Sequence, residues 1–448
     1  MRTITVGQIR WFLFIGYCLV LALLAWYDQP LSPEARTLLQ RPESGVAESK
    51  NAYPYMIGMN FPAASDPAAE GQEVVDWYRT TLLQKKKFTD FYQYPPEYEQ
   101  KRSALKVNGR PPGFHDNDKS GRLLEFVAKN PQKVSDLLRS NELLLNRYRR
   151  LLTFSQYYEP LELGIWMPLP STSATLDLHR LYLLNLGQQS HNGNSDAAVQ
   201  GVKQVMAFWL AIANADTSLM MKFHAFSALR SSLYLVSELS GLPGLTGEKR
   251  EELTQALQFG ASQWQTADVL RSEAIWAERT MATFRMLAKA SHNPVDWLLL
   301  AWLKPNAMAN QLYTQYRHDQ HVASLTAPAL ADYIKKQSGV SPIQVRKLDL
   351  TFVYNPLGEA QAIKSYNLQY SGYARKVHDL EGMRRLAQLT QKASEKRVTP
   401  EGMKAFLATS GPDLNNPYTG LPMSWNADTK SIWFASPGSE KPVEMRVF

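Results

Sequence analysis

The stretch that decides the fold is LMMKFHAFSALRSSLYLVSEL, residues 219–239. Its apolar residues recur at steps of three or four, so they draw one continuous stripe along a helix. The segment 195–215 has a similar apolar spacing through Val202, Val205, Trp209 and Ile212. Because each stripe has to be covered by another element, we expect two consecutive helices that pack as an antiparallel hairpin.

Helical signals continue on both sides of this pair. Asp66-Pro67 predicts the start of a helix that runs to Gln84, since proline is tolerated in the first turn. Thr246, followed by acidic residues, predicts another helix start, and a helical period recurs over 269–287. Successive helical hairpins predict a mainly α, solenoid-like domain over residues 51–340, although no exact repeat is visible.

The C-terminal part has a different pattern. The segments 345–356 (VRKLDLTFVYNP) and 362–372 (AIKSYNLQYSG) mix β-branched and aromatic residues around a turn signal, which predicts a small hairpin. Asp379 is expected to cap a helix that starts near Leu380. Trp425, Ile432, Trp433 and Phe434 predict a second short hairpin, so residues 341–448 are expected to form a small α+β region.

Composition describes an ordinary globular chain. The 448 residues are 44% hydrophobic and 20% charged, which suffices for a large core. The single cysteine, Cys18, excludes a disulfide framework within one chain. The formal charge of +8 is spread out apart from the run Lys85–Lys87. We therefore interpret the charge as solubility with mild attraction to anionic surfaces, and expect no nucleic-acid partner.

The N-terminal run WFLFIGYCLVLALLAWY, residues 11–27, carries no charge. Arg2 and Arg10 precede it and Asp28 follows it, as the positive-inside rule requires of a helix with a cytoplasmic N-terminus. These features predict a cytoplasmic segment 1–10, a transmembrane signal-anchor at 11–27 in a bacterial inner membrane, a proline-rich linker at 28–50 and a periplasmic bulk.

The competing interpretation of this run is a cleaved signal peptide. Cleavage after Ala25 would place Leu23 where a small residue is needed, and Cys18 follows the bulky Tyr17 where a lipoprotein signal needs a small one. The sequence therefore favours an uncleaved anchor.

Several short motifs resemble those of an uncharacterised family of proteobacterial single-pass membrane-anchored periplasmic helical proteins. The family has no assigned activity, so the resemblance implies an anchor and a helical domain but no catalytic residue. The motifs are Tyr55-Met56-Ile57-Gly58-Met59-Asn60, Phe208-Trp209, Met221-Lys222, Lys304-Pro305-Asn306-Ala307, Asn355-Pro356-Leu357-Gly358, Val377-His378-Asp379-Leu380, Arg384-Arg385-Leu386 and Asn416-Pro417-Tyr418-Thr419-Gly420.

No phosphate-binding loop, nucleophile elbow or dinucleotide motif is present, and we expect no catalytic residue, cofactor or metal. His318 and His321 form H-x-x-H, which lacks the further ligands that zinc needs. Glu273 and Glu278 resemble a glycosidase pair in type only, because five positions along a helix point in different directions.

A few other residues are candidate interaction or functional positions. Lys222 is expected to be partly enclosed, with its aliphatic stem packed and its ammonium paired with a carboxylate, and a structural role is favoured over a catalytic one. His378 and Asp379 beside Arg384 and Arg385 suggest acid–base chemistry, but a capping aspartate and an exposed basic face explain them better. Trp425 and Trp433 are the remaining candidate positions.

Two function classes remain open. The large helical surface without a catalytic set favours an interaction protein, a membrane-anchored periplasmic scaffold for an envelope protein partner in a secretion, pilus or cell-wall assembly. The alternative is a membrane-tethered enzyme acting on cell-wall glycan or peptide, with the aromatic segment Phe88–Tyr98 stacking on sugars.

Overall fold

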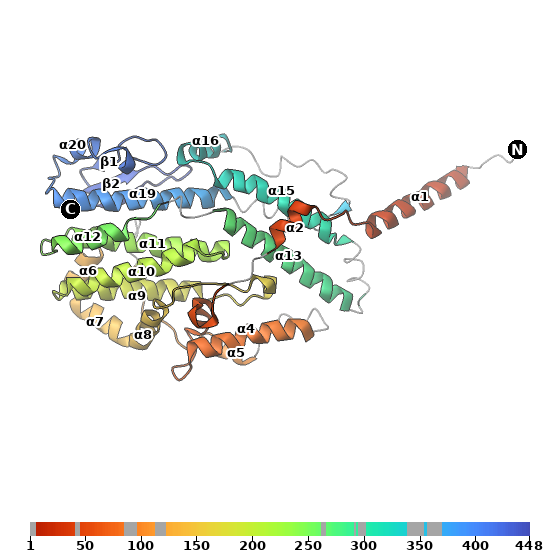
Figure 1. The fold of residues 1–448 in the computed structure, drawn as a ribbon, viewed down its shortest axis with the longest axis horizontal. Coiled ribbons are helices and arrows are strands. Elements are labelled where there is room, and N and C mark those ends of the chain that lie inside the picture. Colours follow the sequence, from red (N-terminus) through yellow and green to blue (C-terminus); the bar gives the residue numbers. More distant parts are fainter. Residues whose placement is uncertain are drawn as a thin grey trace.

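The computed structural model describes residues 6–40, 45–84, 96–112, 122–260, 266–290, 293, 302–337, 354–355 and 370–448. This part of the chain is mainly helical, with one three-stranded sheet near the C-terminus. The prediction of a mainly α protein with a small β-containing C-terminal part is confirmed. Figure 1 shows several long helices running side by side along the body.

The centre of the body consists of α9 (Thr172–His191), α10 (Ser195–Asn214) and α11 (Leu219–Ser240), which pack against one another. The predicted hairpin of α10 and α11 is confirmed. The turn between them ends at Ser218, whose Oγ accepts a hydrogen bond from the Met221 amide. Trp209, Leu229 and Leu233 are fully buried, as the two apolar stripes require.

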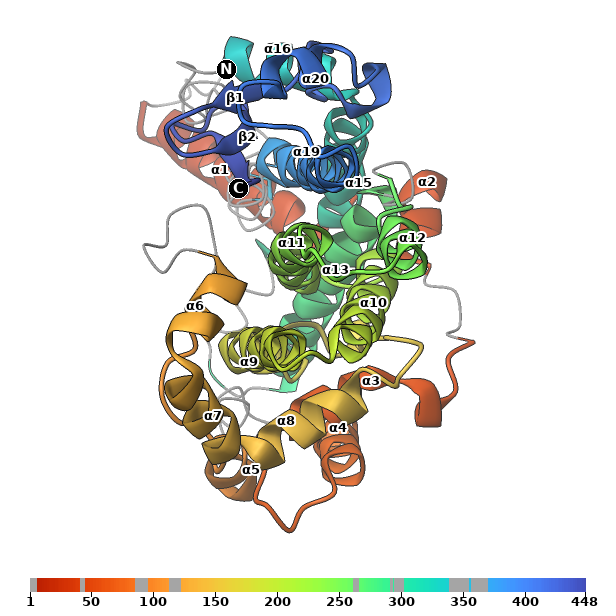
Figure 2. The same ribbon diagram turned by 90° about the vertical axis from the view of Figure 1, so that its left-hand side faces the viewer.

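The stacking also joins segments that are far apart in the sequence. The long helix α19 (Tyr370–Glu395) packs on α11, and α15 (Pro305–Ala323) packs on both α19 and α13 (Thr266–Ala290). In the end-on view of Figure 2, α19, α11 and then α9 with α10 form successive layers. The shorter helices α12 (Gly247–Ala256) and α16 (Ala327–Gln337) lie beside α10 and α19. Thr246 caps α12 as predicted, accepting from the Lys249 amide at 3.3 Å.

The lower part of Figure 1 contains α4 (Pro67–Gln84), which begins and ends at the predicted residues. It packs closely on α3 (Ala52–Gly58), because Gly71 has no side chain where the helix meets the Pro54 carbonyl. The remaining short helices here are α5 (Pro96–Lys101), α6 (Leu123–Lys129), α7 (Pro131–Ser140) and α8 (Glu142–Leu151), with the 3₁₀ turns η1 (Glu48–Lys50) and η3 (Leu161–Trp166).

The N-terminal helix α1 (Val6–Trp26) extends away from the body, and its large apolar side chains, such as Trp11 and Trp26, are exposed. Within the described residues, no helix combines the length and the apolarity needed to cross a membrane. The predicted transmembrane signal-anchor is therefore wrong. The inner-membrane placement and the periplasmic location of the bulk rested on that anchor, and they are wrong with it.

The residues expected to form a linker contain the helix α2 (Pro33–Leu39). Ser32 caps this helix, and Ala35 and Leu38 are buried. The helix packs on α13 and α15, so these apolar positions attach the N-terminal segment to the body.

The C-terminal sheet is antiparallel in the order β1 (Ser424–Asn426), β2 (Ser431–Phe434), β3 (Val443–Arg446). The predicted hairpin is present, with β3 as an additional strand. Two short helical segments precede it, α20 (Met403–Ala408) and η6 (Pro412–Leu414). The hairpin predicted from 345–356 and 362–372 lies almost wholly outside the described residues.

Candidate functional site

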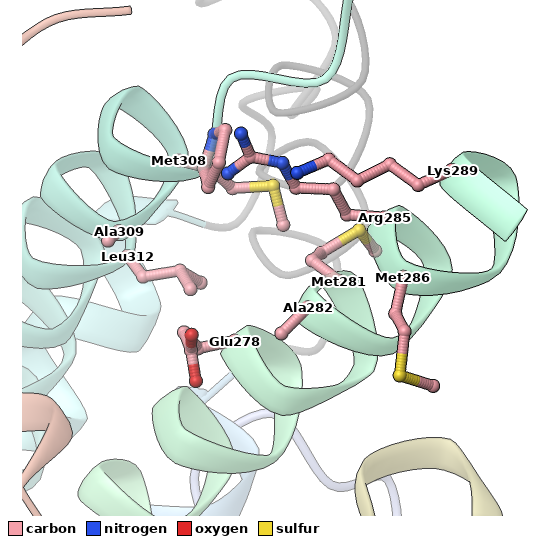
Figure 3. Close-up of a pocket in the computed structure, with 10 residues that line it drawn as sticks. Glu278, Met281, Ala282, Arg285, Met286, Lys289, Met308, Ala309 and Leu312 are labelled. Atoms are coloured by element: carbon pink, nitrogen blue, oxygen red, sulfur yellow. The ribbon is translucent and has the colours of Figure 1, made fainter. Parts of the chain in front are cut away.

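A groove of about 410 Å³ runs between α13 and α15 (Figure 3). The α13 wall comprises an apolar and charged stripe, and the α15 wall is apolar. The lining residues are Glu278, Met281, Ala282, Arg285, Met286 and Lys289 from α13, and Pro305, Met308, Ala309 and Leu312 from α15.

The spacing along α13 explains why these residues share one face. Glu278, Ala282, Arg285 and Lys289 follow at steps of four, three and four, which is the period of one helix face. Three methionines, Met281, Met286 and Met308, supply much of the apolar lining. Methionine is unbranched and polarisable, so such a surface can adapt to different apolar shapes.

The middle of α13 is held in place by the 3₁₀ turn η3. Gly164 lies in this turn with φ of +54°, and a Cβ at this position would lie 2.7 Å from the Thr280 backbone nitrogen. Glycine is thus needed both for the positive φ and for the close approach of the two backbones. This contact fixes the α13 wall of the groove.

The N-terminus of α15 is capped from the N-terminal segment. The Asp28 carboxylate accepts hydrogen bonds from the Asn306 and Ala307 amides at 2.9 and 3.1 Å. Asn310 accepts from the Ser32 amide at 2.8 Å and donates to the Pro30 carbonyl at 2.9 Å. An acidic cap satisfies amides that the helix itself leaves unpaired, so the α15 wall is also fixed.

The charges of the groove are separated. Glu278 lies at one end, and Arg285 and Lys289 at the other (Figure 3). Burial raises the pKa of the Glu278 carboxyl, which Arg279 opposes from an ion-pair distance of 3.4 Å. Among the described residues, no carboxylate forms an ion pair with Arg285 or Lys289. The groove therefore offers an apolar middle between an acidic and a basic end.

Lys222 is buried in α11, and its Nζ donates to the Ala213 carbonyl at 2.6 Å. This bond links α11 back to the end of α10. The enclosure expected from the sequence is thus observed, and the geometry gives Lys222 a structural contact between the two helices of the hairpin.

His378 and Asp379 lie in the middle of α19, so the prediction that Asp379 caps a helix near Leu380 is wrong. Its carboxylate accepts hydrogen bonds from the Tyr418 hydroxyl at 2.7 Å and the Ser436 hydroxyl at 2.9 Å. Burial raises its pKa, and these hydrogen bonds oppose the rise. The His378 ring lies 3.1 Å from the Leu325 carbonyl. Asp379 consequently fastens the C-terminal segments to α19.

Arg384 and Arg385 do not form an exposed basic face, because both pair with Glu381 at 2.6 and 2.8 Å. Arg384 also donates to the Leu257 carbonyl at 3.3 Å, and Arg385 to the Asn415 carbonyl at 2.8 Å. The interpretation of these arginines as a solvated face is wrong, since they connect α19 to neighbouring segments.

The two tryptophans belong to the C-terminal sheet. Trp425 in β1 contacts the ring of Phe448 edge-on, and Trp433 in β2 is partly buried. The apolar core of this sheet comprises Ile432, Phe434 and Met445, which are almost fully buried. Neither tryptophan lies in the lining of the α13–α15 groove.

The two glutamates considered as a glycosidase pair, Glu273 and Glu278, lie in different environments. Glu273 accepts a hydrogen bond from the Leu219 amide at 2.7 Å, at the start of α11, where Glu159 also accepts from the Ser218 amide. Burial raises the pKa of Glu273 to about 7. Glu278 lines the groove instead. The structure does not bring the two carboxylates into one cleft.

His318 and His321 are exposed on α15. Asp319 between them is buried, and burial raises its pKa to about 7 while Gln315 donates to it at 2.8 Å. No group of three potential metal ligands is found in the part of the chain that the structure describes. The aromatic segment Phe88–Tyr98 lies mostly outside that part.

Most of the groove could not be predicted from the sequence. The period over 269–287 predicted most of α13, including Arg285, whereas Lys289 lies just beyond the predicted range. The pairing of α13 with α15 carries no local signal, because it depends on contacts with η3, α2 and α19.

No protein-family model matches the chain, and neither a curated protein nor a solved structure matches it. The resemblance to a family of membrane-anchored helical proteins therefore stays a prediction.

Proposed function

We propose that this protein works by association, as a helical scaffold that holds a protein partner in the α13–α15 groove. The observation that carries the proposal is the groove itself, an apolar channel between two helices with both walls fixed by the rest of the fold.

A helix is the partner element that such a channel fits best. Two adjacent helices leave a groove along their length, and an amphipathic helix inserts its apolar side chains at positions i, i+3, i+4 and i+7. The methionines on both walls permit side chains of different shape to pack there. Met286 and Ala282 are exposed, so the partner would cover apolar surface that water now contacts.

The wider surface supports the same class of function. The body is mainly helical, and the predicted solenoid-like arrangement would suit a scaffold. The large apolar side chains of α1 are also exposed, as is common where proteins associate.

The alternative of an enzyme acting on cell-wall glycan or peptide has no specific support. Glu273 caps α11 and Glu278 lines the groove, so they do not form the opposed pair that a glycosidase needs. We therefore propose only the scaffold.

The proposal is tested by photo-crosslinking in cells from position Met286, followed by binding measurements with the purified partner. Replacing Ala282, an exposed lining residue, by Trp fills the groove and is expected to weaken binding at least tenfold. Ala69→Trp, on the exposed surface of α4, is the matched control. If Ala282→Trp and Ala69→Trp bind the partner equally well, the groove is not the binding site and the proposal fails.

A further inference from the structure

The order of charges along α13 carries information about what occupies the groove. Glu278 and Arg285 are seven residues apart, and Glu278 and Lys289 eleven. At a rise of 1.5 Å per residue, the acidic and basic ends are about 10 to 17 Å apart along the helix. Between them lie Met281 and Ala282, with Met308 and Leu312 on the facing wall.

Resting on the proposed function of the groove, we propose that its occupant is an amphipathic helix with charges at both ends of its apolar stripe. A basic residue of the partner faces Glu278, and an acidic residue two to three turns along faces Arg285 and Lys289. The apolar residues between them pack on the methionines.

Glu278 is the residue that distinguishes this partner from a simple anionic amphiphile such as a fatty acid. A fatty acid would place its carboxylate at Arg285 and Lys289 and its tail along the methionines, and the tail would then end against the carboxyl of Glu278. The Glu278 carboxyl already pairs with Arg279 at 3.4 Å, and an alkyl chain against it would remove water without adding a further polar partner. A basic side chain of a peptide would instead add a second cationic partner for Glu278 at this end of the groove.

The charges are expected to select the partner more than to provide its affinity. Both ends are partly exposed, and ion pairs in such places contribute little individually. Complementary charges still fix register and suppress mismatched partners. The two ion pairs together are therefore expected to change the affinity about threefold to tenfold. The remaining binding free energy would come from apolar contacts with the methionines of the groove.

Synthetic helical peptides with one common Leu and Met stripe test the inference on the full-length protein. In the first peptide a Lys and a Glu on the stripe's border are seven residues apart. In the second peptide the Lys and the Glu lie on adjacent turns, four residues apart. In the third peptide both residues are replaced by Gln. Fluorescence anisotropy measures the dissociation constant of each. We expect the first peptide to bind threefold to tenfold more tightly than the other two.

Variants of the protein identify the residues that cause the preference for the first peptide. Glu278→Gln and Arg285→Gln are each expected to reduce the advantage of the first peptide over the third, whereas Glu73→Gln on the exposed face of α4 leaves it unchanged. The conservative Arg285→Lys variant should retain most of the advantage. Circular dichroism and the melting temperature of each variant show that the fold persists.

The outcomes separate the inference from the function on which it rests. If all three peptides bind equally and Ala282→Trp weakens each of them, the groove binds helices but the charge pattern is wrong. If no peptide binding responds to Ala282→Trp, the proposed function fails as well. If dodecanoate binds in the groove and displaces the peptides while Glu278→Gln tightens its binding, the occupant is an anionic amphiphile and the inference is overturned.

Discussion

The ring of Phe434 packs directly against the backbone of Gly382, so that a Cβ at Gly382 would overlap the ring. Phe434 belongs to β2 and Gly382 to the middle of α19. The absence of a side chain at this position lets the strand approach the helix closely. Because Phe434 is only 1% exposed, its ring has little room to move.

Gly382→Ala should therefore destabilise the protein by about 1–3 kcal/mol, the usual cost of overpacking a core. Gly372 lies in the same helix with open space around its Cα, and Gly372→Ala is the matched control. Alanine is a better helix former than glycine, so the control should be neutral or more stable by up to about 1 kcal/mol. Chemical denaturation measures the free energy of unfolding of both variants. Equal values for Gly382→Ala and Gly372→Ala would contradict the packing argument.

Arg147 offers a test in the N-terminal part of the body. Its guanidinium is buried and donates to the carbonyls of Met59, Phe61 and Pro62 at 2.9, 2.7 and 2.7 Å. These carbonyls belong to the turn between α3 and α4. The planar fork of five donors suits several acceptors at once, which the single ammonium of lysine does not.

We expect Arg147→Lys to lower the free energy of unfolding by about 2–4 kcal/mol, since buried carbonyls lose their donors. Arg139→Lys is the control, because Arg139 forms an exposed ion pair with Asp136. Its effect should remain within about 0.5 kcal/mol. Thermal and urea unfolding compare the two variants, and a loss at Arg147 no larger than at Arg139 would show that the turn does not depend on the guanidinium.

The pKa of Glu273 makes stability depend on pH. Burial raises it to about 7, aided by the charge of Glu159 and opposed by the Leu219 amide, while its ordinary value is 4.5. Between these values the folded chain keeps a proton that the unfolded chain releases. The contribution of Glu273 to the free energy of unfolding therefore falls as pH rises from about 4.5 to about 7.

Glu273→Gln keeps an oxygen that can accept from the Leu219 amide but cannot ionise. The variant should lose this part of the pH dependence and exceed the wild type in stability above pH 7 by about 1–3 kcal/mol. Glu248→Gln, at an exposed position of α12, should leave the pH profile unchanged. Unfolding curves at pH 5, 6, 7 and 8 measure the free energy of unfolding of each variant. If this free energy depends on pH in the same way for wild type and Glu273→Gln, Glu273 is not the cause of the pH dependence.

Local signals predicted those elements whose boundaries are set by neighbouring residues. The α4 helix begins at Pro67, where proline fits the first turn, and α12 begins after the Thr246 cap. The stripe of α11 predicted buried residues such as Leu229 and Leu233, but the helix is buried on most sides, because α9, α10 and α19 all pack on it.

Features that depend on distant contacts were not predictable in this way. Asp379 has the sequence context of a cap, yet it lies inside α19 because Tyr418 and Ser436 satisfy its carboxylate from far along the chain. The groove likewise requires Asp28 at the start of α15 and Gly164 against α13, and neither residue signals this contact locally.

The C-terminal sheet is expected to be indispensable for the stability of α19. Ile432, Phe434 and Met445 are at most 1% exposed, and each contributes roughly 1.5–3 kcal/mol by burial. Their sum approaches the net stability of a typical domain. A chain that ends at Gly411 should therefore melt at a clearly lower temperature or lose solubility.

Because such a chain can fail to fold altogether, Phe434→Ala in the full-length protein is the finer measurement, with an expected loss of about 3–5 kcal/mol in the free energy of unfolding. Leu421→Ser, at a position that is 65% exposed in the same region, is the control and should be neutral. If the truncated chain and Phe434→Ala both unfold like the wild type, the sheet is peripheral to the core.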